Sequence, residues 1–351
     1  MKTIPIAPLD SRKQLILKAV VTDYVRTAEP VGSHVLAARY EFGVRSATIR
    51  NEMAELADLG YLHQPHTSAG RIPSDQGYRF YVDRLMDSIS VPGSEMGVSN
   101  PKLAPRRTEM DVILEHTCRL LSELAHYTSL ASQPSVKDAI VLHISVAMVA
   151  RSRALVVVVL DNGGVLHDMV ELGEAQARFD PVRATSYLSR KLVGRSLDSL
   201  NEVVSDPATE VGERMNELLG RVVEFVRREL QPGDGTDIHL EGASYIMQQP
   251  EFRDAERLEA VLSVLEQRSA LYRLFSSVYL GEDVTIIIGT ENPLNEMCDC
   301  SFVGKKYRIR GRVAGTLGVV GPTRMDYRRA VGAVNFMVGN LEQLLTDLSV
   351  S

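Results

Sequence analysis

The fold of the first part of this chain is decided by residues 45–73, R-S-A-T-I-R-N-E-M-A-E-L-A-D-L-G-Y-L-H-Q-P-H-T-S-A-G-R-I-P. Ser46 is a favourable helix N-cap, and apolar residues recur at helical spacing from Ile49 to Leu56. Gly60 then supplies a helix end. We therefore predict a short helix with one buried face, followed by a small basic hairpin.

The opposite face of this helix carries side chains suited to reading DNA bases. Arg50 has a guanidinium that can pair with guanine or phosphate, and Asn51 has an amide suited to adenine. Small residues beside them allow the helix to approach the bases closely. The predicted DNA contacts of this helix are Arg45, Ser46, Ala47, Thr48, Arg50 and Asn51.

The residues after the helix predict a hairpin that could serve as the wing of a DNA-binding domain. Tyr61–His63 has the pattern of an outgoing strand, residues 70–72 lie on or near the return strand, and Pro65 lies in the tip. Such a hairpin can contact phosphates or the minor groove. The predicted contacts are His63, His66, Ser68, Gly70 and Arg71. The alternative is a solvated hairpin beside an ordinary surface helix.

Two further helices are predicted upstream of this stretch. The sequence S-R-K-Q at Ser11–Gln14 has the form of a capping box and opens the first helix. Ser33 caps a shorter second helix, and Glu41–Val44 supplies the turn before Arg45. Three helices followed by a hairpin are typical of a winged helix-turn-helix that binds DNA.

The formal net charge of −6 is unusual for a DNA-binding protein, but the charge is unevenly distributed. Residues 11–86 contain ten Lys or Arg against eight Asp or Glu, whereas residues 87–351 contain 28 against 36. A locally basic surface favours phosphate binding, and an acidic remainder discourages non-specific binding of the rest of the chain to DNA. Because the basic excess is only two charges, we expect two copies to bind DNA together.

The composition is that of a globular protein of two or three domains, with 351 residues of which 44% are hydrophobic. No apolar run follows Met1, and the longest strongly apolar segment, Ala154–Leu160, is far too short to span a bilayer. We expect a soluble, cytoplasmic protein. Cys118, Cys298 and Cys300 give no disulfide framework, and the last two lack a matching pair for zinc, so no metal is predicted.

The rest of the chain predicts an α+β layout. A helix capped by Ser74 carries tyrosines that we interpret as packing residues rather than a base-stacking surface, and residues 90–107 have the Pro and Gly content of a linker. Helices are then predicted at 109–130 and about 325–345, and strands at 141–149, 154–160, 284–288, 307–313 and 316–320, with a turn at 161–164. We expect the strands of 141–160 to pair with those of 284–320.

The region between those two groups of strands, residues 186–277, is mostly helical by its periodicity. Its clearest helical segments are Met215–Leu230 and Ala255–Leu274. The region therefore looks like an insertion into the β-rich domain on either side of it.

Two long motifs stand at opposite ends of the chain. The first is R-S-A-T-I-R-N-E-M, from Arg45, followed by T-S-A-G-R-I-P-S-D-Q-G-Y-R, from Thr67. The second block, Gly289–Tyr327, contains G-T-E-N, C-S-F-V, Y-R-I-R-G and G-V-V-G-P-T-R-M-D-Y. Both motifs resemble signatures of the HrcA family of heat-inducible transcription repressors. The resemblance covers nearly the whole chain and is weakest in residues 90–107 and in the middle third.

This resemblance implies a winged helix-turn-helix, then a GAF-like domain interrupted by an inserted dimerising domain. Accordingly, we predict a DNA-binding domain at 1–89, a linker at 90–108, the GAF-like domain at 109–185 and 278–351, and the insertion at 186–277. The resemblance also implies a homodimer that represses chaperone operons by binding double-stranded DNA at the CIRCE inverted repeat. The chaperonin GroEL would support its activity, and chaperonin occupied by unfolded proteins would release repression.

No motif in the sequence indicates an enzyme, since a Walker loop, a G-x-S-x-G elbow and H-E-x-x-H are all absent, and we predict no cofactor. Gly318–Tyr327 could hold an anion, but we favour a structural role in which Thr323 caps the last helix. Gly289–Asn292 could line a ligand cleft, although Asn292 could equally fix a turn. Two alternatives to a heat-shock repressor are a small-molecule-responsive GAF-type regulator and an adaptor that uses the winged helix for protein contacts.

Overall fold

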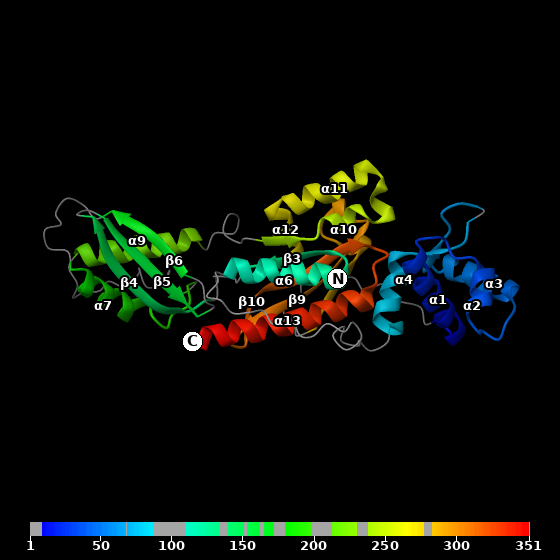
Figure 1. Cartoon of the computed structure of the whole chain (residues 1–351), viewed down its shortest axis with the longest axis horizontal. Helices are drawn as coiled ribbons and strands as arrows, with labels where there is room; N and C mark the ends of the chain where they lie inside the picture. Colours follow the sequence, from blue (N-terminus) through cyan, green and yellow to red (C-terminus); the bar gives the residue numbers. More distant parts are fainter. Residues whose placement is uncertain are drawn as a thin grey trace.

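The structure is a computed structural model, and it describes the chain in ranges separated by gaps. These ranges are residues 9–67, 69–86, 110–133, 139–150, 153–161, 165–171, 180–197, 199, 213–229, 238–276 and 283–350. Helices and antiparallel strands are mixed along the chain, as the α+β prediction requires. Figure 1 shows three units in a row, with a small helical unit at one end, a five-stranded sheet with its helices in the centre, and a three-stranded sheet with two helices at the other end.

The N-terminal unit contains three helices and a hairpin, in the predicted order. The helices are α1 (Ser11–Thr27), α2 (Ser33–Arg39) and α3 (Ser46–Asp58), and the hairpin strands are β1 (Leu62–His63) and β2 (Ile72–Pro73). A further helix follows as α4 (Asp75–Phe80), which continues as the π-helical turn η1 (Tyr81–Leu85). The predicted cap of α4 is confirmed, because Ser74 Oγ accepts a hydrogen bond from Gly77 N at 3.0 Å.

The caps of the earlier helices differ from the prediction. Asp10, rather than Ser11, caps α1 by accepting a hydrogen bond from Lys13 N at 2.9 Å. An ionised carboxylate is a strong acceptor for the free N–H groups of a first turn, and it stands one residue ahead of the serine. At α3 the residue in the cap position is Arg45, and the Ser46 hydroxyl instead lies 3.1 Å from the Ser33 hydroxyl of α2.

The central unit is built on one antiparallel sheet, in the order β7 (Ile238–Glu241), β3 (Thr128–Ser132), β10 (Arg312–Pro322), β9 (Cys300–Ile309) and β8 (Thr285–Ile288). Side chains alternate between its two faces. Val303 and Val319 pack with the helices α6 (Met110–Ala125) and α13 (Tyr327–Val350). Their neighbours Phe302 and Val320 pack on the opposite face.

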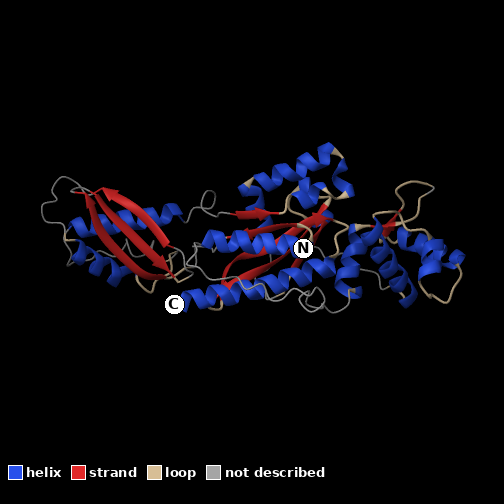
Figure 2. Ribbon diagram, viewed as in Figure 1, coloured by secondary structure: helices blue, strands red, loops and turns tan. Residues whose placement is uncertain are grey.

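That opposite face is covered by short helices that follow β7 in the chain, as Figure 2 shows. They are α10 (Ser244–Met247), the 3-10 turn η2 (Pro250–Arg253), α11 (Ala255–Glu266) and α12 (Arg268–Ser276). Two more 3-10 turns, η3 (Gly289–Glu291) and η4 (Asn295–Met297), join β8 to β9. The sheet is therefore enclosed by helices on both sides.

The third unit contains the sheet β4 (Val141–Ala150), β5 (Arg153–Leu160) and β6 (Val165–Glu171), with β5 in the middle. Its inner face packs on α7 (Pro181–Leu192) and α9 (Glu213–Glu229). The inner core includes Val156 and Val158 of β5, while Val157 between them is only half-buried on the outer face. This unit therefore has one packed face and one face that no described helix covers.

The prediction that strands of 141–160 pair with strands of 284–320 is wrong. β4 and β5 pair with each other, and the distant partner of β10 is β3, through pairs such as Leu317 with Ala131. The inserted unit therefore lies between β3 and β7 and includes β4–β6, whereas α10–α12 belong to the central unit. The sequence pattern does not distinguish the two arrangements, because an uncharged β-rich strand fits either sheet and its partner is not encoded locally.

Two boundaries within the central unit also differ from the prediction. The helix predicted at 109–130 ends at Ala125, and residues 128–132 form β3, because His126 takes a positive φ of 60° and turns the chain. The turn between β9 and β10 lies at Arg310 and Gly311, whose φ angles are 52° and 79°. Two successive positive φ angles are typical of a tight hairpin turn.

Candidate nucleic-acid interface

The exposed face of α3 carries the residues predicted to contact DNA bases. Ala47, Arg50 and Asn51 are exposed, while Ser46 and Thr48 are half-buried at the start of the helix. The opposite face is fixed in the core through Ile49, Met53 and Leu56, which are at most 3% exposed. Figure 1 shows α3 at the outer end of the molecule, away from both larger sheets.

Ion pairs between α1 and α3 hold α3 in place. Lys13 Nζ lies 2.8 Å from Glu52 and 2.9 Å from Glu55, both on α3, and Arg12 lies 3.6 Å from Glu52. The hydrogen bond to Glu52 raises the pKa of Lys13, so the lysine stays charged. Glu52 and Glu55 of α3 are thereby paired with the basic side chains of α1.

A buried carboxylate anchors α2 to α1. Asp23 of α1 is 2% exposed and accepts hydrogen bonds from Arg39 Nη1 at 2.8 Å and from the Tyr40 hydroxyl at 3.2 Å. Arg26 lies 3.3 Å from the same carboxylate. A buried carboxylate needs such charged and hydrogen-bonding partners. Asp23 was not singled out from the sequence, because an isolated acidic residue in an amphipathic helix gives no local signal of burial.

The hairpin contains the predicted wing residues, with one outside the described residues. His63 and His66 are exposed, whereas Ser68 lies outside the part of the chain that the structure describes. Gly70 has a structural role, because a Cβ on it would overlap the Val31 carbonyl oxygen. The backbone of Arg71 exchanges two hydrogen bonds of 2.9 Å with Val31. The return strand is thus seated against the loop between α1 and α2.

The distribution of unpaired cations also favours this surface. Lys13, Arg26, Arg39 and Arg79 are all engaged by carboxylates. The arginines of residues 9–86 that form no ion pair with any described residue are Arg45, Arg50, Arg71 and Arg84. Three of these four belong to the predicted helix and hairpin, where unpaired positive charge can meet phosphate or a base edge.

The family follows from comparison with known proteins. A family model described as the HrcA protein C terminal domain matches residues 111–331. A heat-inducible transcription repressor HrcA of Symbiobacterium thermophilum is 39% identical over 336 residues, which cover 96% of this chain and 98% of that protein. The repressor of the same name from Desulforamulus reducens is 38% identical over 338 residues, or 96% of this chain and 97% of that protein. The chain belongs to the HrcA family of heat-inducible transcription repressors.

A solved structure is also similar over nearly the whole chain. It is described as a hypothetical protein at 2.2 Å resolution, and it matches with a TM-score of 0.58 and 21% identity over 97% of this chain and 98% of that chain. This similarity supports the fold alone. No helix in the described ranges has both the length and the apolar character that a membrane crossing requires.

The other candidate sites of this family member take structural roles. Asn292 Nδ2 donates to the carbonyl oxygens of Gly289, Met297 and Cys300, at 2.9, 3.1 and 2.8 Å, so this residue fixes the η3–η4 turns. Asp326, rather than Thr323, caps α13, with its carboxylate 3.1 Å from Arg329 N. Among the described residues, no three His, Cys, Asp or Glu side chains cluster as a metal site.

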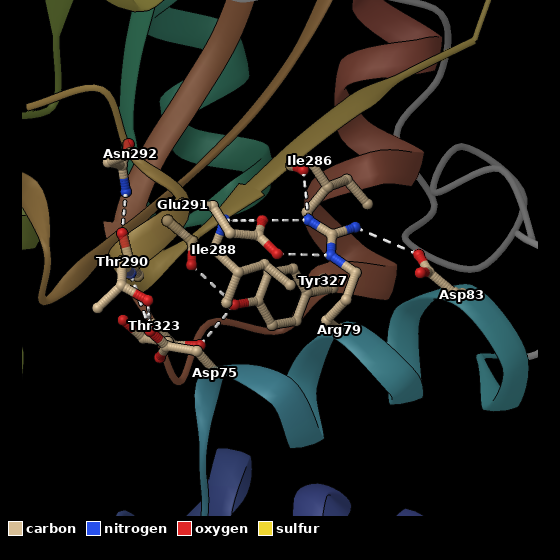
Figure 3. Close-up of polar contacts among 12 residues, drawn as sticks. Asp75, Arg79, Asp83, Ile286, Ile288, Thr290, Glu291, Asn292, Thr323 and Tyr327 are labelled. Carbon is tan, nitrogen blue, oxygen red and sulfur yellow. Dashed lines mark hydrogen bonds and ion pairs between the residues drawn. The ribbon is translucent and has the colours of Figure 1, made fainter. Parts of the chain in front are cut away.

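One set of contacts was not predicted although both of its halves lie in the quoted motifs. S-D-Q-G-Y-R at residues 74–79 meets G-T-E-N at residues 289–292, where α4 packs against η3 (Figure 3). Sequence separation of more than 200 residues hides this pairing from any local pattern. In the sequence, the pairing was indicated only by the opposite charges of Arg79 and Glu291.

Proposed function

We propose that this chain is a homodimeric cytoplasmic repressor that binds an inverted-repeat operator of heat-shock genes. The first three helices and the hairpin would act as a winged helix-turn-helix. The observation that carries this proposal is the exposed face of α3. Arg50 carries an unpaired positive charge there, with Ala47 and Asn51 exposed beside it, and ion pairs with α1 hold the helix in place. Arg45, Ser46 and Thr48 would complete the contact at the helix start.

The hairpin would act mainly on the phosphate backbone. His63, His66 and Ser68 would approach the phosphates or the minor groove beside the helix. Arg71 would add a charge near the base of the hairpin, and Gly70 would serve indirectly by letting the hairpin pack against Val31. Phosphate contacts of this kind position a protein on DNA without reading its sequence.

We infer that the unit containing β4–β6 is the inserted dimerising domain, and that the dimer forms through the outer face of its three-stranded sheet. Five of the eleven large hydrophobic residues that are exposed in the described chain lie on the sheet strands β4 and β6. On the outer face, Val157 lies between Ser145 and His167, with Leu155 and Met169 beside them. A second copy would bury this apolar face, as exposed patches of this kind often require.

The remaining parts of the proposal come from family membership. The central five-stranded unit would be the GAF-like domain, the operator would be of the CIRCE type, and the chaperonin GroEL would support the active form. Relatives carry the name heat-inducible transcription repressor, which agrees with loss of repression on heating.

The proposal is tested by footprinting the full-length protein on chaperone promoters of its own organism at a stated salt concentration. We expect protection of two half-sites related by two-fold symmetry, with a centre-to-centre distance near a whole number of helical turns. The protection should weaken steeply as salt is raised, because phosphate contacts release counterions. Absence of any protected inverted repeat in these promoters would contradict the proposed function.

A further inference from the structure

The contact between α4 and η3 joins the N-terminal unit to the central unit through a group of specific polar bonds. Asp75 Oδ2 accepts hydrogen bonds from Thr290 N at 2.8 Å and from the Thr290 hydroxyl at 2.7 Å. One turn further along α4, Arg79 faces Glu291 (Figure 3). Both residues of α4 are thus bound to the same short turn of the central unit.

The Arg79 contact is bidentate and partly removed from solvent. Its Nε donates to Glu291 Oε1 at 2.9 Å, and Nη2 donates both to Glu291 Oε2 and to the carbonyl of Ile286, the latter at 2.7 Å. The side chains of Arg79 and Glu291 are 24% and 32% exposed. Glu291 is itself fixed, because it accepts a hydrogen bond from Ile288 N at 2.9 Å. A bidentate pair on a fixed carboxylate specifies orientation as well as proximity.

The backbone of the central unit is shaped to receive this contact. Gly289 has a φ of 50°, and a Cβ on it would overlap the carboxylate of Asp75. Only glycine combines this conformation with so close an approach. The G-T-E-N motif therefore supplies a glycine for space, a threonine for Asp75 and a glutamate for Arg79.

A second anchor joins the end of α1 to the central unit. Arg324 donates through Nη1 to the carbonyl of Val25, near the end of α1, at 2.6 Å. Its Nε donates to Glu251 at 2.5 Å, and the arginine is only 12% exposed. Between the two anchors the rings of Tyr78 and Tyr327 pack with their centres 5.7 Å apart. The apolar core is continuous across this boundary, from α1 and α3 to α13.

We propose that Asp75, Arg79, Thr290, Glu291 and Arg324, here called the interdomain latch, fix the direction of α3 and make the dimer selective for the spacing between operator half-sites. This inference rests on the proposed function, since spacing has meaning only for two readers on one operator. Two anchors at separate points, on α4 and on α1, oppose rotation of the N-terminal unit more strongly than a single point of attachment would. Asp75, Arg79, Thr290, Glu291 and Arg324 are positioning residues, distinct from those that contact bases.

The physical reason lies in the geometry of DNA. Each inserted base pair moves one half-site by about 3.4 Å and rotates it by about 35° around the helix axis. A dimer with rigid readers can then engage only one half-site, and the gain from binding both, of about a hundredfold or more, is lost. Readers freed from the latch would tolerate a wrong spacing but would bind the correct spacing less tightly.

The test uses the full-length protein, a single half-site and a series of inverted repeats whose spacer differs from the natural one by up to three base pairs. We expect the unaltered protein to lose about a hundredfold in affinity when the spacer changes. Glu291→Ala should bind the natural spacer about tenfold more weakly and the altered spacers nearly as well as the natural one. Its affinity for the single half-site should stay within about twofold, because α3 is unchanged.

The matched control is Arg84→Ala. Arg84 lies in the turn after α4, is exposed and forms no ion pair with the described residues, so its removal should keep the normal spacer profile.

A double-mutant cycle separates this role from general loss of stability. Arg79→Ala and the double variant should flatten the spacer profile to the same extent, because Glu291 has no other described partner on α4 once Arg79 is removed. Glu291→Ala should flatten it at most as far, because Arg79 keeps its hydrogen bond to the Ile286 carbonyl. A normal spacer profile in Glu291→Ala would overturn the proposal. Loss of single half-site binding in the same variant would also overturn it, because the contact would then support folding of the reader. If the unaltered protein bound no inverted repeat, the proposed function would fail and the latch proposal would fall with it.

Discussion

At the scale of single residues, the helix and the hairpin differ in how their arginines are held. Arg50 is exposed on α3 and forms no ion pair with the described chain, and Asn51 beside it is also exposed. Arg71 is half-buried, and its backbone is bonded to Val31 on the neighbouring loop. The side chains of Arg50 and Asn51 can therefore enter a groove, whereas Arg71 lies close to the protein body and can reach only a nearby phosphate.

We expect Arg50→Ala and Asn51→Ala each to cost about 1 to 3 kcal/mol of operator binding and to relax base preference at one position of each half-site. Arg71→Ala should weaken all DNA sequences alike and lower the salt slope by about one. Titrations against the operator, single-base variants and unrelated DNA at several salt concentrations would measure both effects. An Asn51→Ala protein with undiminished discrimination between operator and variants would show that α3 does not read bases through this residue.

A pair of tyrosines at the boundary between units gives a second residue-scale prediction. The Tyr78 hydroxyl is buried and has no hydrogen-bond partner among the described residues, and burial raises its pKa well above the usual value. The Tyr327 hydroxyl lies 2.8 Å from the Ser301 hydroxyl and donates to the Thr323 carbonyl at 2.6 Å. We expect Tyr78→Phe to leave stability unchanged or improved, and Tyr327→Phe to cost about 1 to 2 kcal/mol. Urea unfolding of the two variants would compare them directly, and equal losses would contradict the bonding described here.

At the scale of elements, the sequence predicted local structure better than it predicted pairing. The order of α1, α2, α3 and the hairpin was predictable because apolar spacing and Gly60 act within a few residues. The strands within 141–160 and 284–320 were also expected, but their partners were not. β3 was hidden at the end of a predicted helix, and it alone connects β7 to β10 across the insertion.

The candidate interface was predicted in part for the same reason. Exposure of Arg50 and Asn51 follows from helical periodicity once Ile49 and Met53 face the core. The supports of that surface, such as Lys13 bound to Glu52, join residues almost 40 positions apart. Long-range ion pairs have no periodic signature, so the sequence indicated the reading face without indicating what holds it.

The outer face of the β4–β6 sheet supports an element-scale prediction about assembly. Val157 on β5 is half-buried, and Met169 on β6 is 42% exposed, both on the side away from α7 and α9. We expect Val157→Lys and Met169→Lys to convert the dimer into a monomer and to lower operator affinity by at least about tenfold. Sedimentation at micromolar concentration would measure the change. Val182→Lys, at an exposed apolar residue of α7 on the opposite side, is the control and should remain dimeric; dimers that survive both sheet substitutions would place the interface elsewhere.

At the scale of the whole molecule, the central sheet closes only after distant segments meet. β3 pairs with β7 more than 100 residues later and with β10 more than 180 residues later. Non-local pairing of this kind slows folding and leaves apolar strands exposed for longer. Ala154–Leu160 is at risk meanwhile, because it is uncharged and becomes protected only as the middle strand of its sheet.

This topology leads us to expect that the amount of active repressor is limited by folding and supported by chaperonin. Mild heating of the purified protein should abolish operator binding irreversibly, because partly open chains aggregate before the central sheet closes again. Chaperonin with ATP should then raise the fraction of active dimers without altering the affinity of each active dimer. Titration of the protein with operator DNA well above the dissociation constant counts active dimers directly.

Cys118 gives an independent measure of opening. Burial raises the pKa of Cys118 to about 12 and suppresses its alkylation in the folded unit, and the exposed Cys298 serves as the reference thiol. An unchanged active fraction after chaperonin treatment, or full recovery with a small molecule alone, would favour a ligand-responsive regulator instead.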